Sequence, residues 1–309
     1  MHLSLQRIAA DLKMCKEQNL DTIDGIYLSP DPKNPYVVYI MIIGPQDTPY
    51  QNGYYFFHLT FPGNYPFAPP VVKLMTQGHW VRFNPNFYVN GKVCISILNT
   101  WKGPQWTSCL NLKQIVLSLQ SLMNNNPLIN EPGWEVNPNR IQHKVYKSII
   151  TNENIRTAIL GMITTPPKGF EIFLPVMSNL FIENYNAIND LMTKLSQAGT
   201  KKDYTCTVYN MTTRYNYTDI RLLLNKLYNK LTIDNNTLSS SKENNTTQTQ
   251  SAVAEANKQK KRRVPNQNAK EFYFNEGSDA TLAYNGHIFS VYTDKIGHFR
   301  WRKQPTNTA

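Results

Sequence analysis

Cysteine is scarce in this sequence: the chain has four in 309 residues, Cys15, Cys94, Cys109 and Cys206, and they form no Cys-x-x-Cys pair. The sequence also lacks a signal-peptide pattern and any apolar run long enough to cross a bilayer. These absences exclude a disulfide scaffold and a membrane-spanning helix. They indicate a reduced compartment, the cytosol or the nucleus.

Acidic residues are also few, because 21 Asp and Glu against 32 Lys and Arg give a formal net charge of +11. Such a charge suits an acidic partner surface, a nucleic acid or an anionic lipid. Since no nucleic-acid-binding motif is present, neither nucleic acid nor a membrane is expected as a partner. The six histidines and four cysteines show no ligand spacing, so no metal and no cofactor are expected.

The sequence does contain an ordered series of helix and strand signals. The spacing of Leu5, Ile8, Leu12 and Cys15 predicts an amphipathic helix over residues 3–18, with Cys15 in the core. Four runs rich in β-branched and aromatic residues are expected to form strands: Gly25–Leu28, Tyr36–Ile43, Tyr54–Phe61 and Val71–Met75. The short links between them favour an antiparallel four-stranded meander flanked by helices, which is an α+β fold.

Apolar spacing predicts three further helical regions, at residues 112–123, 139–164 and 170–197. An irregular Tyr-rich link is expected next, followed by a last helix capped by Tyr217-Thr218-Asp219 and bearing Ile220, Leu223, Leu224 and Leu227. We therefore expect residues 1–165 to form a core domain and residues 166–231 a helical extension packed on it.

The last quarter of the chain changes in composition. Residues 232–257 are rich in Asn, Ser, Thr and Gln and are expected to begin a disordered linker that runs to residue 269. Within it, Lys258–Arg263 is a basic cluster for which a nuclear import signal and solvated charge are both open. Residues 270–309 alternate apolar and polar side chains around the hairpin signal Tyr284-Asn285-Gly286-His287. They predict a small β-module of three or four strands.

The candidate for chemistry is Cys94, eight residues after an Asn-Pro-Asn turn. Asn84-Pro85 and Asn90-Gly91 are turn dipeptides, so the backbone must fold back between them and bring Cys94 beside Asn86. A thiolate is a strong nucleophile, and its thioester can be passed to an amine. An Asn amide could donate a hydrogen bond to the oxyanion of that transfer. The alternative is a buried core thiol, because Ile95, Ile97 and Leu98 follow.

A family resemblance extends over these residues. The motifs that carry it are Gly44-Pro45-x-x-Thr48-Pro49-Tyr50-x-x-Gly53, Phe61-Pro62-x-x-Tyr65-Pro66-Phe67-x-Pro69-Pro70, Asn84-Pro85-Asn86 with Cys94, and Trp101 and Trp106. In this order they resemble the ubiquitin-conjugating enzyme family, and the run around Cys94 with Asn130-Glu131-Pro132-Gly133 is most similar to its large Z-type subgroup. That subgroup also has asparagine at the Asn84 position, where most of the family has histidine.

The resemblance implies a ubiquitin-conjugating fold and assigns a role to each matching residue. An activating enzyme would pass ubiquitin, or a ubiquitin-like protein, to Cys94, and a substrate lysine amine would then accept it. Asn86 would stabilise the oxyanion or brace the loop, and Glu131 would be the acid at the lip of the site, with a solvated turn carboxylate as the alternative. Partner contacts are implied for Phe67 and Trp106 with a ubiquitin ligase. Arg7 and Lys13 lie off the buried stripe of the first helix, where they are either solvated or, as the resemblance implies, in contact with the activating enzyme.

One departure from the family pattern, one alternative chemistry and one rival function remain to be weighed. The family's Ser-Pro-Ala ligase loop is replaced here by Thr107-Ser108-Cys109, and Cys109 is expected to be a small core residue, or alternatively an exposed second thiol. A Cys–His protease is disfavoured because the nearest histidine is His79 and no protease signature surrounds Cys94. The rival function is a catalytically silent ubiquitin-binding variant that acts through its tail; such variants lack the cysteine.

Overall fold

The computed structural model describes residues 3–137, 140–197 and 199–234, together with three strands between residues 281 and 303. The chain divides into two compact units, Met1–Asn236 and Thr237–Ala309, which are described separately. None of the helices in these described ranges is long and apolar enough to cross a membrane.

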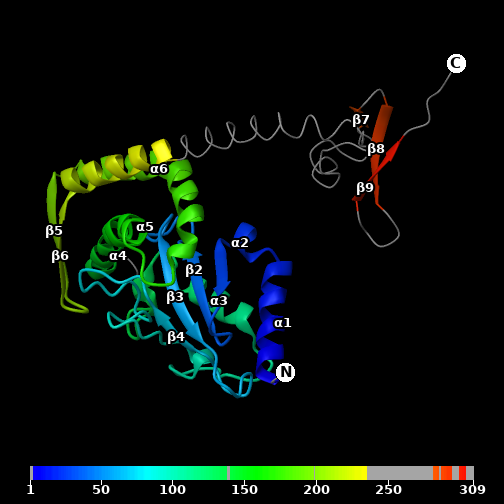
Figure 1. The fold of residues 1–309 in the computed structure, drawn as a ribbon. Coiled ribbons are helices and arrows are strands. Elements are labelled where there is room, and N and C mark those ends of the chain that lie inside the picture. Colours follow the sequence, from blue (N-terminus) through cyan, green and yellow to red (C-terminus); the bar gives the residue numbers. More distant parts are fainter. Residues whose placement is uncertain are drawn as a thin grey trace. The chain divides into compact units, whose positions relative to one another are not determined.

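The first unit is built on a four-stranded sheet of strands β1 (Ile26–Pro30), β2 (Val37–Ile43), β3 (Tyr54–Thr60) and β4 (Val71–Leu74). The strands pair antiparallel in the order β1-β2-β3-β4. Helix α1 (Leu3–Glu17) precedes the sheet, followed by the short α2 (Leu20–Ile23) (Figure 1). The predicted α+β meander is confirmed, as is the core position of Cys15, which is 2% exposed.

Further helices follow the sheet, and most agree with the predicted ranges. They are η1 (Ser96–Leu98), α3 (Leu112–Ser121), η2 (Pro127–Asn130), α4 (Ile141–Glu153), η3 (Asn154–Gly161), α5 (Met162–Thr164), η4 (Glu171–Phe173) and α6 (Leu174–Ser196). Helix α3 begins at a capping box, in which the Asn111 side chain and the Gln114 side chain each bond the other's backbone N–H. This cap fixes where the long loop after β4 ends.

The sheet is covered on both faces, because alternate residues of its central strands belong to different cores. Ile40 and Phe57 lie in the cluster that includes α1 and α3. Met41 and Phe56 lie in a second cluster that residues of the C-terminal extension complete. Phe56 stacks on Phe170 at 4.7 Å between ring centroids. Strands buried on both faces read as continuous apolar runs, which is why β2 and β3 stand out in the sequence.

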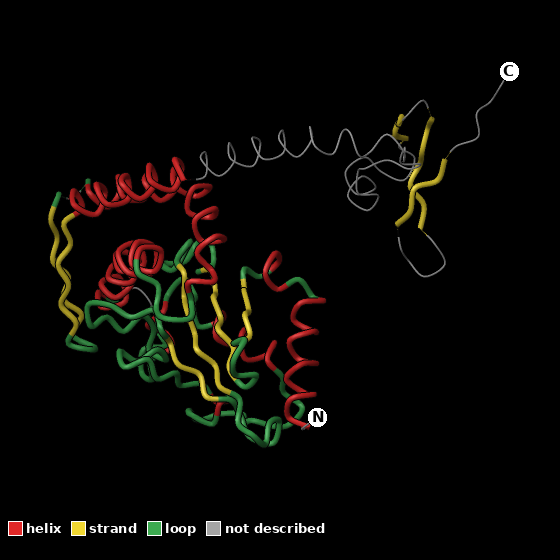
Figure 2. Tube along the Cα trace, viewed as in Figure 1, coloured by secondary structure: helices red, strands yellow, loops and turns green. Residues whose placement is uncertain are grey.

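The Tyr-rich link after α6 is not irregular, so that prediction was wrong. Strands β5 (Lys201–Cys206) and β6 (Met211–Asn216) form an antiparallel hairpin (Figure 2). Alternate side chains of β6 are buried, and Asn210 turns the chain with a φ of 53°. Asn and a few other residues tolerate this left-handed conformation, so the turn needs no glycine.

Residues 217–234 are helical, so the last helix continues three residues past the boundary expected at 231. Its cap is Asn216, whose side-chain oxygen accepts hydrogen bonds from the N–H groups of Thr218 and Asp219. The predicted cap, Tyr217-Thr218-Asp219, was therefore misplaced toward the C-terminus. Leu223, expected on the buried stripe, is 53% exposed.

In the second unit, β7 (Thr281–Tyr284), β8 (His287–Thr293) and β9 (Phe299–Lys303) form an antiparallel sheet in that order. Tyr284 pairs with His287, the register expected from the hairpin signal. Residues 270–280 of the predicted β-module, most of the predicted linker and the basic cluster at 258–263 lie outside the described residues.

Candidate active site

The loop around Cys94 is held by isolated backbone pairs and one obligatory glycine. Phe87 pairs with both Asn84 and Val93, which folds the segment back on itself. Gly91 has a φ of +86°, and its carbonyl accepts a hydrogen bond from Leu74 of β4 at 2.8 Å. A Cβ at Gly91 would lie 2.6 Å from the Leu74 oxygen, so only glycine fits this turn. The loop is thereby pinned to the sheet edge.

Cys94 and Asn86 are joined by two hydrogen bonds. The Cys94 N–H donates to the Asn86 carbonyl at 2.9 Å, and the Asn86 side-chain amide donates to the Cys94 carbonyl at 2.6 Å. Both residues are buried, Cys94 at 3% and Asn86 at 9% exposure. One amide proton of Asn86 is therefore used to hold the cysteine backbone. The structure brings the two predicted residues together, and its geometry favours the bracing role of Asn86.

Asn84 fixes Asn86 in turn. Its side-chain oxygen accepts the Asn86 N–H at 2.9 Å, and its amide donates to the Leu122 carbonyl at 2.8 Å, at the end of α3. The amide of Asn130 lies 3.4 Å from the same Asn84 oxygen and donates to Leu122 as well. A fully buried asparagine thus links the loop to the segment that carries Glu131. An asparagine suits the position of residue 84 because its side-chain amide can both donate and accept a hydrogen bond, and Asn84 does both here.

The sequence analysis missed Thr100. Its hydroxyl accepts the Ile95 N–H at 3.0 Å and lies 3.1 Å from the Val93 carbonyl and 3.0 Å from the Ile95 carbonyl, to one of which it donates. The backbone on both sides of Cys94 therefore lies within hydrogen-bond distance of one side chain. The only sequence signal is a hydroxyl residue within one turn of a short apolar run, a pattern that occurs in many loops.

Glu131 is half-buried and bound to the C-terminal extension. One oxygen of its carboxylate accepts a hydrogen bond from the Tyr209 hydroxyl at 2.7 Å. Burial, together with this hydrogen bond to Glu131, raises the pKa of Tyr209 well above its ordinary value, so Tyr209 stays a donor at neutral pH. Tyr209 lies in the turn between β5 and β6, the hairpin that the sequence analysis did not predict.

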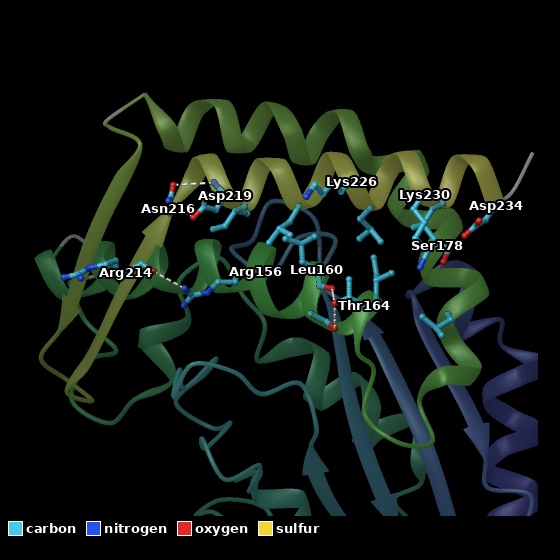
Figure 3. A pocket seen from close by; sticks show the side chains of 17 residues that line it. Arg156, Leu160, Thr164, Ser178, Arg214, Asn216, Asp219, Lys226, Lys230 and Asp234 are labelled. Atoms are coloured by element: carbon cyan, nitrogen blue, oxygen red, sulfur yellow. Dashed lines mark hydrogen bonds between the residues drawn. The ribbon is translucent and has the colours of Figure 1, made fainter.

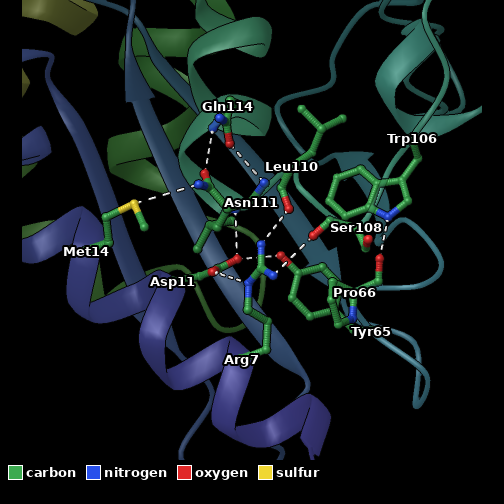
Figure 4. A network of polar contacts seen from close by, with 11 residues as sticks. Arg7, Asp11, Met14, Tyr65, Pro66, Trp106, Ser108, Leu110, Asn111 and Gln114 are labelled. Carbon is green, nitrogen blue, oxygen red and sulfur yellow. Dashed lines mark hydrogen bonds and ion pairs between the residues drawn. The ribbon is translucent and has the colours of Figure 1, made fainter.

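Arg7 is largely engaged inside the molecule. Its guanidinium donates to Asp11 at 2.8 Å and to the carbonyls of Ser108 at 3.2 Å and Leu110 at 2.7 Å (Figure 4). Tyr65 and the Leu112 N–H also donate to Asp11, which is 2% exposed. The network joins α1 to the start of α3. Lys13, by contrast, keeps its side chain 74% exposed, with only a 3.7 Å ion pair to Glu17.

The two residues expected to contact a ligase differ in exposure. Phe67 is 76% exposed, whereas Trp106 is 8% exposed and donates its indole N–H to the Pro66 carbonyl at 2.7 Å. Trp106 thus supports the turn that presents Phe67. The two cysteines outside the loop differ as well. Cys109 is exposed, so its expected place in the core was wrong. Cys15 is buried, and burial together with the charge of Asp11 raises the pKa of its thiol to about 11.

A groove of about 910 Å³ lies elsewhere in the first unit, between η3, α6 and the last helix (Figure 3). Its aliphatic floor includes Leu160, Leu223 and Leu227. None of the predicted site residues lines it. No group of three or more His, Cys, Asp or Glu in the described ranges is arranged to hold a metal ion.

Comparison with known proteins gives consistent matches over this part of the chain. The family model described as ubiquitin-conjugating enzyme matches residues 7–148. Ubiquitin-conjugating enzyme E2 Z of Danio rerio is 43% identical over 163 residues, which are 52% of this chain and 50% of that protein. A dual E2 ubiquitin-conjugating enzyme/E3 ubiquitin-protein ligase of Homo sapiens is 39% identical over 165 residues, 49% of this chain and 3% of that protein. The chain thus spans about half the length of the E2 Z proteins it matches, or less.

Proposed function

Residues 7–148 of the chain belong to the ubiquitin-conjugating enzyme family, and from that premise we propose that the protein carries ubiquitin or a ubiquitin-like protein as a thioester on Cys94. The observation that carries the proposal is the brace on Cys94. One asparagine binds both the N–H and the carbonyl of Cys94, through its backbone and its side chain, and so fixes the cysteine backbone within the matched family motif.

Two acyl transfers make up the proposed reaction. In the first, the Cys94 thiolate attacks the thioester carbonyl carbon on the activating enzyme, a new S–C bond forms and the activating enzyme's thiolate leaves. In the second, a lysine amine attacks the Cys94 thioester, the isopeptide C–N bond forms, Cys94 leaves as thiolate and the amine loses a proton. The chain supplies the nucleophile and its scaffold, and no cofactor takes part after activation.

The supporting residues take roles that follow from their contacts. Asn86 braces the Cys94 backbone, and the Glu131 carboxylate receives the lysine and its proton. Phe67 is the exposed apolar contact for a ligase, and Lys13 is an exposed cation on α1 available to an activating enzyme. Arg7 serves instead to hold α1 against the start of α3. The protein acts in the cytosol or nucleus of a eukaryotic cell. A viral gene is a candidate source, because the chain is 36% identical over 181 residues to a probable ubiquitin-conjugating enzyme of Acanthamoeba polyphaga mimivirus.

The test is thioester formation on the intact chain. The protein is incubated with ATP, ubiquitin and each of a panel of activating enzymes, and the products are separated with and without reducing agent. We expect an adduct that reductant removes, that Cys94→Ala abolishes and that Cys94→Ser replaces with a reductant-resistant oxyester. Cys109→Ala is the matched control, because Cys109 is the exposed thiol. An adduct that persists in Cys94→Ala would place the thioester on another cysteine and overturn the assignment, whereas no adduct with any activating enzyme would favour the silent-variant alternative.

A further inference from the structure

The turn of the β5–β6 hairpin lies on the segment that leads into the Cys94 loop. The Arg82 N–H donates to the Met211 sulfur at 3.3 Å, and the Arg82 carbonyl accepts the Tyr146 hydroxyl at 2.6 Å. The rings of Tyr146 and Tyr209 meet edge to face, with 5.7 Å between centroids. The hairpin therefore contacts Arg82 directly through Met211 and packs on Tyr146, which also bonds Arg82. Arg82 and Met211 are 129 positions apart in the sequence.

Arg82 connects the hairpin to the loop through its guanidinium. The group lies 4.4 Å from the centroid of the Tyr209 ring and 3.8 Å from that of Tyr88. It also donates to the carbonyl of Pro85, next to Asn86. A cation between two aromatic faces holds both rings in place, and the contact strengthens when water is excluded. The Tyr209 ring is thereby fixed relative to the turn that holds Cys94.

The hydroxyl of this fixed ring donates to Glu131 at 2.7 Å. A glutamate has three side-chain torsions, and a half-buried turn leaves several rotamers open to it. The hydrogen bond selects one orientation and occupies one carboxylate oxygen, so the second oxygen stays available to an incoming amine. The contact chain Asn130, Asn84, Asn86 ties the same turn to Cys94 from the other side.

We infer that Tyr209 is a positioning residue for the proposed transfer: it orients the Glu131 carboxylate for the attacking lysine, so the C-terminal extension completes the active site. The inference rests on the proposed function. Thioester formation does not need Glu131, because the activating enzyme supplies its own groups. The loss of the Tyr209 hydroxyl should therefore affect the second transfer and spare the first.

The test uses the full chain charged with ubiquitin and then mixed with free lysine in a single-turnover assay. We expect Tyr209→Phe to form the thioester at the wild-type rate and to discharge it about 10-fold more slowly, the scale of one hydrogen bond to a charged group. Tyr204→Phe is the matched control on the same hairpin, since its hydroxyl contacts Tyr217 and no carboxylate. It should discharge at the wild-type rate.

A double-mutant cycle and the dependence of discharge on lysine concentration separate positioning from general support. In a Glu131→Ala background, Tyr209→Phe should slow discharge no further, because the hydroxyl then has no carboxylate to orient. Because the oriented carboxylate acts while the amine attacks, Tyr209→Phe should lower the maximum discharge rate at saturating lysine, and Tyr204→Phe should not. Additive effects, or an unchanged maximum rate, overturn the inference while leaving the proposed function intact. Failure of the wild-type chain to charge overturns the function itself.

Discussion

Replacing Asn86 by alanine tests whether this residue braces Cys94 or stabilises the oxyanion. The substitution removes the 2.6 Å hydrogen bond to the Cys94 carbonyl and leaves that buried acceptor without its side-chain partner. An unsatisfied buried acceptor costs about 2 kcal/mol of unfolding free energy. For a folded unit of this size, that corresponds to a fall in Tm of about 4–8 °C.

The assay combines thermal unfolding with the two kinetic steps. If Asn86 is a brace, its loss displaces the Cys94 backbone, so thioester formation and discharge to lysine should fall by similar factors while Tm drops. Asn90→Ala is the control in the same loop, because the Asn90 side chain bonds an exposed backbone N–H that water can satisfy. An unchanged Tm with discharge alone slowed about 10²-fold would refute the bracing argument and identify an oxyanion donor.

Four further outcomes follow from the described contacts. Arg7→Ala should lower Tm by several degrees, because charged hydrogen bonds of about 1.5–3 kcal/mol each are lost around buried Asp11, whereas Lys13→Ala should leave Tm unchanged. Phe67→Ala should leave Tm and thioester formation unchanged and abolish only ligase-stimulated discharge; a loss of charging would place Phe67 in the activating-enzyme contact instead. A disulfide-exchange reagent at pH 8 should modify Cys109 within seconds and Cys15 only on unfolding, since burial raises the pKa of Cys15 from 9.0 to about 11. The raised pKa of Cys15 contributes to stability in full below pH 9, and this contribution is lost as the pH rises through 11. In a thermal melt, the fall in Tm between pH 9 and pH 11 should therefore be smaller in Cys15→Ala than in the wild type.

Much of the fold could be predicted because its signals are local. The strands β2 and β3 are unbroken runs of β-branched and aromatic residues between Pro, Gly and Asn, and each run forms a strand whatever lies elsewhere in the chain. The nearness of Cys94 and Asn86 followed from two turn dipeptides a few residues apart. In both cases the determining residues are close in sequence.

The parts that were missed depend on distant residues or on weak alternation. Strands β5 and β6 alternate Lys, Asp, Thr and Tyr, so their buried face contains threonine and is not distinctly apolar. The bond between Glu131 and Tyr209 joins residues 78 positions apart, and no local pattern encodes it. Helical spacing placed Arg7 off the buried stripe but could not show that two loop carbonyls lie within reach of its guanidinium.

The double covering of the sheet has a consequence for synthesis on the ribosome. Most of the first core comes from residues up to Ile150, whereas Met41, Tyr54 and Phe56 belong to a second core whose other members run from Ile155 to Leu227. At about 5–20 residues per second, the interval between residues 150 and 227 lasts roughly 4–15 s. During the first part of that interval, before Phe170 and Phe173 have been made, a nascent chain leaves the aromatic face of the meander uncovered, so chaperones that bind apolar surfaces should associate with it there.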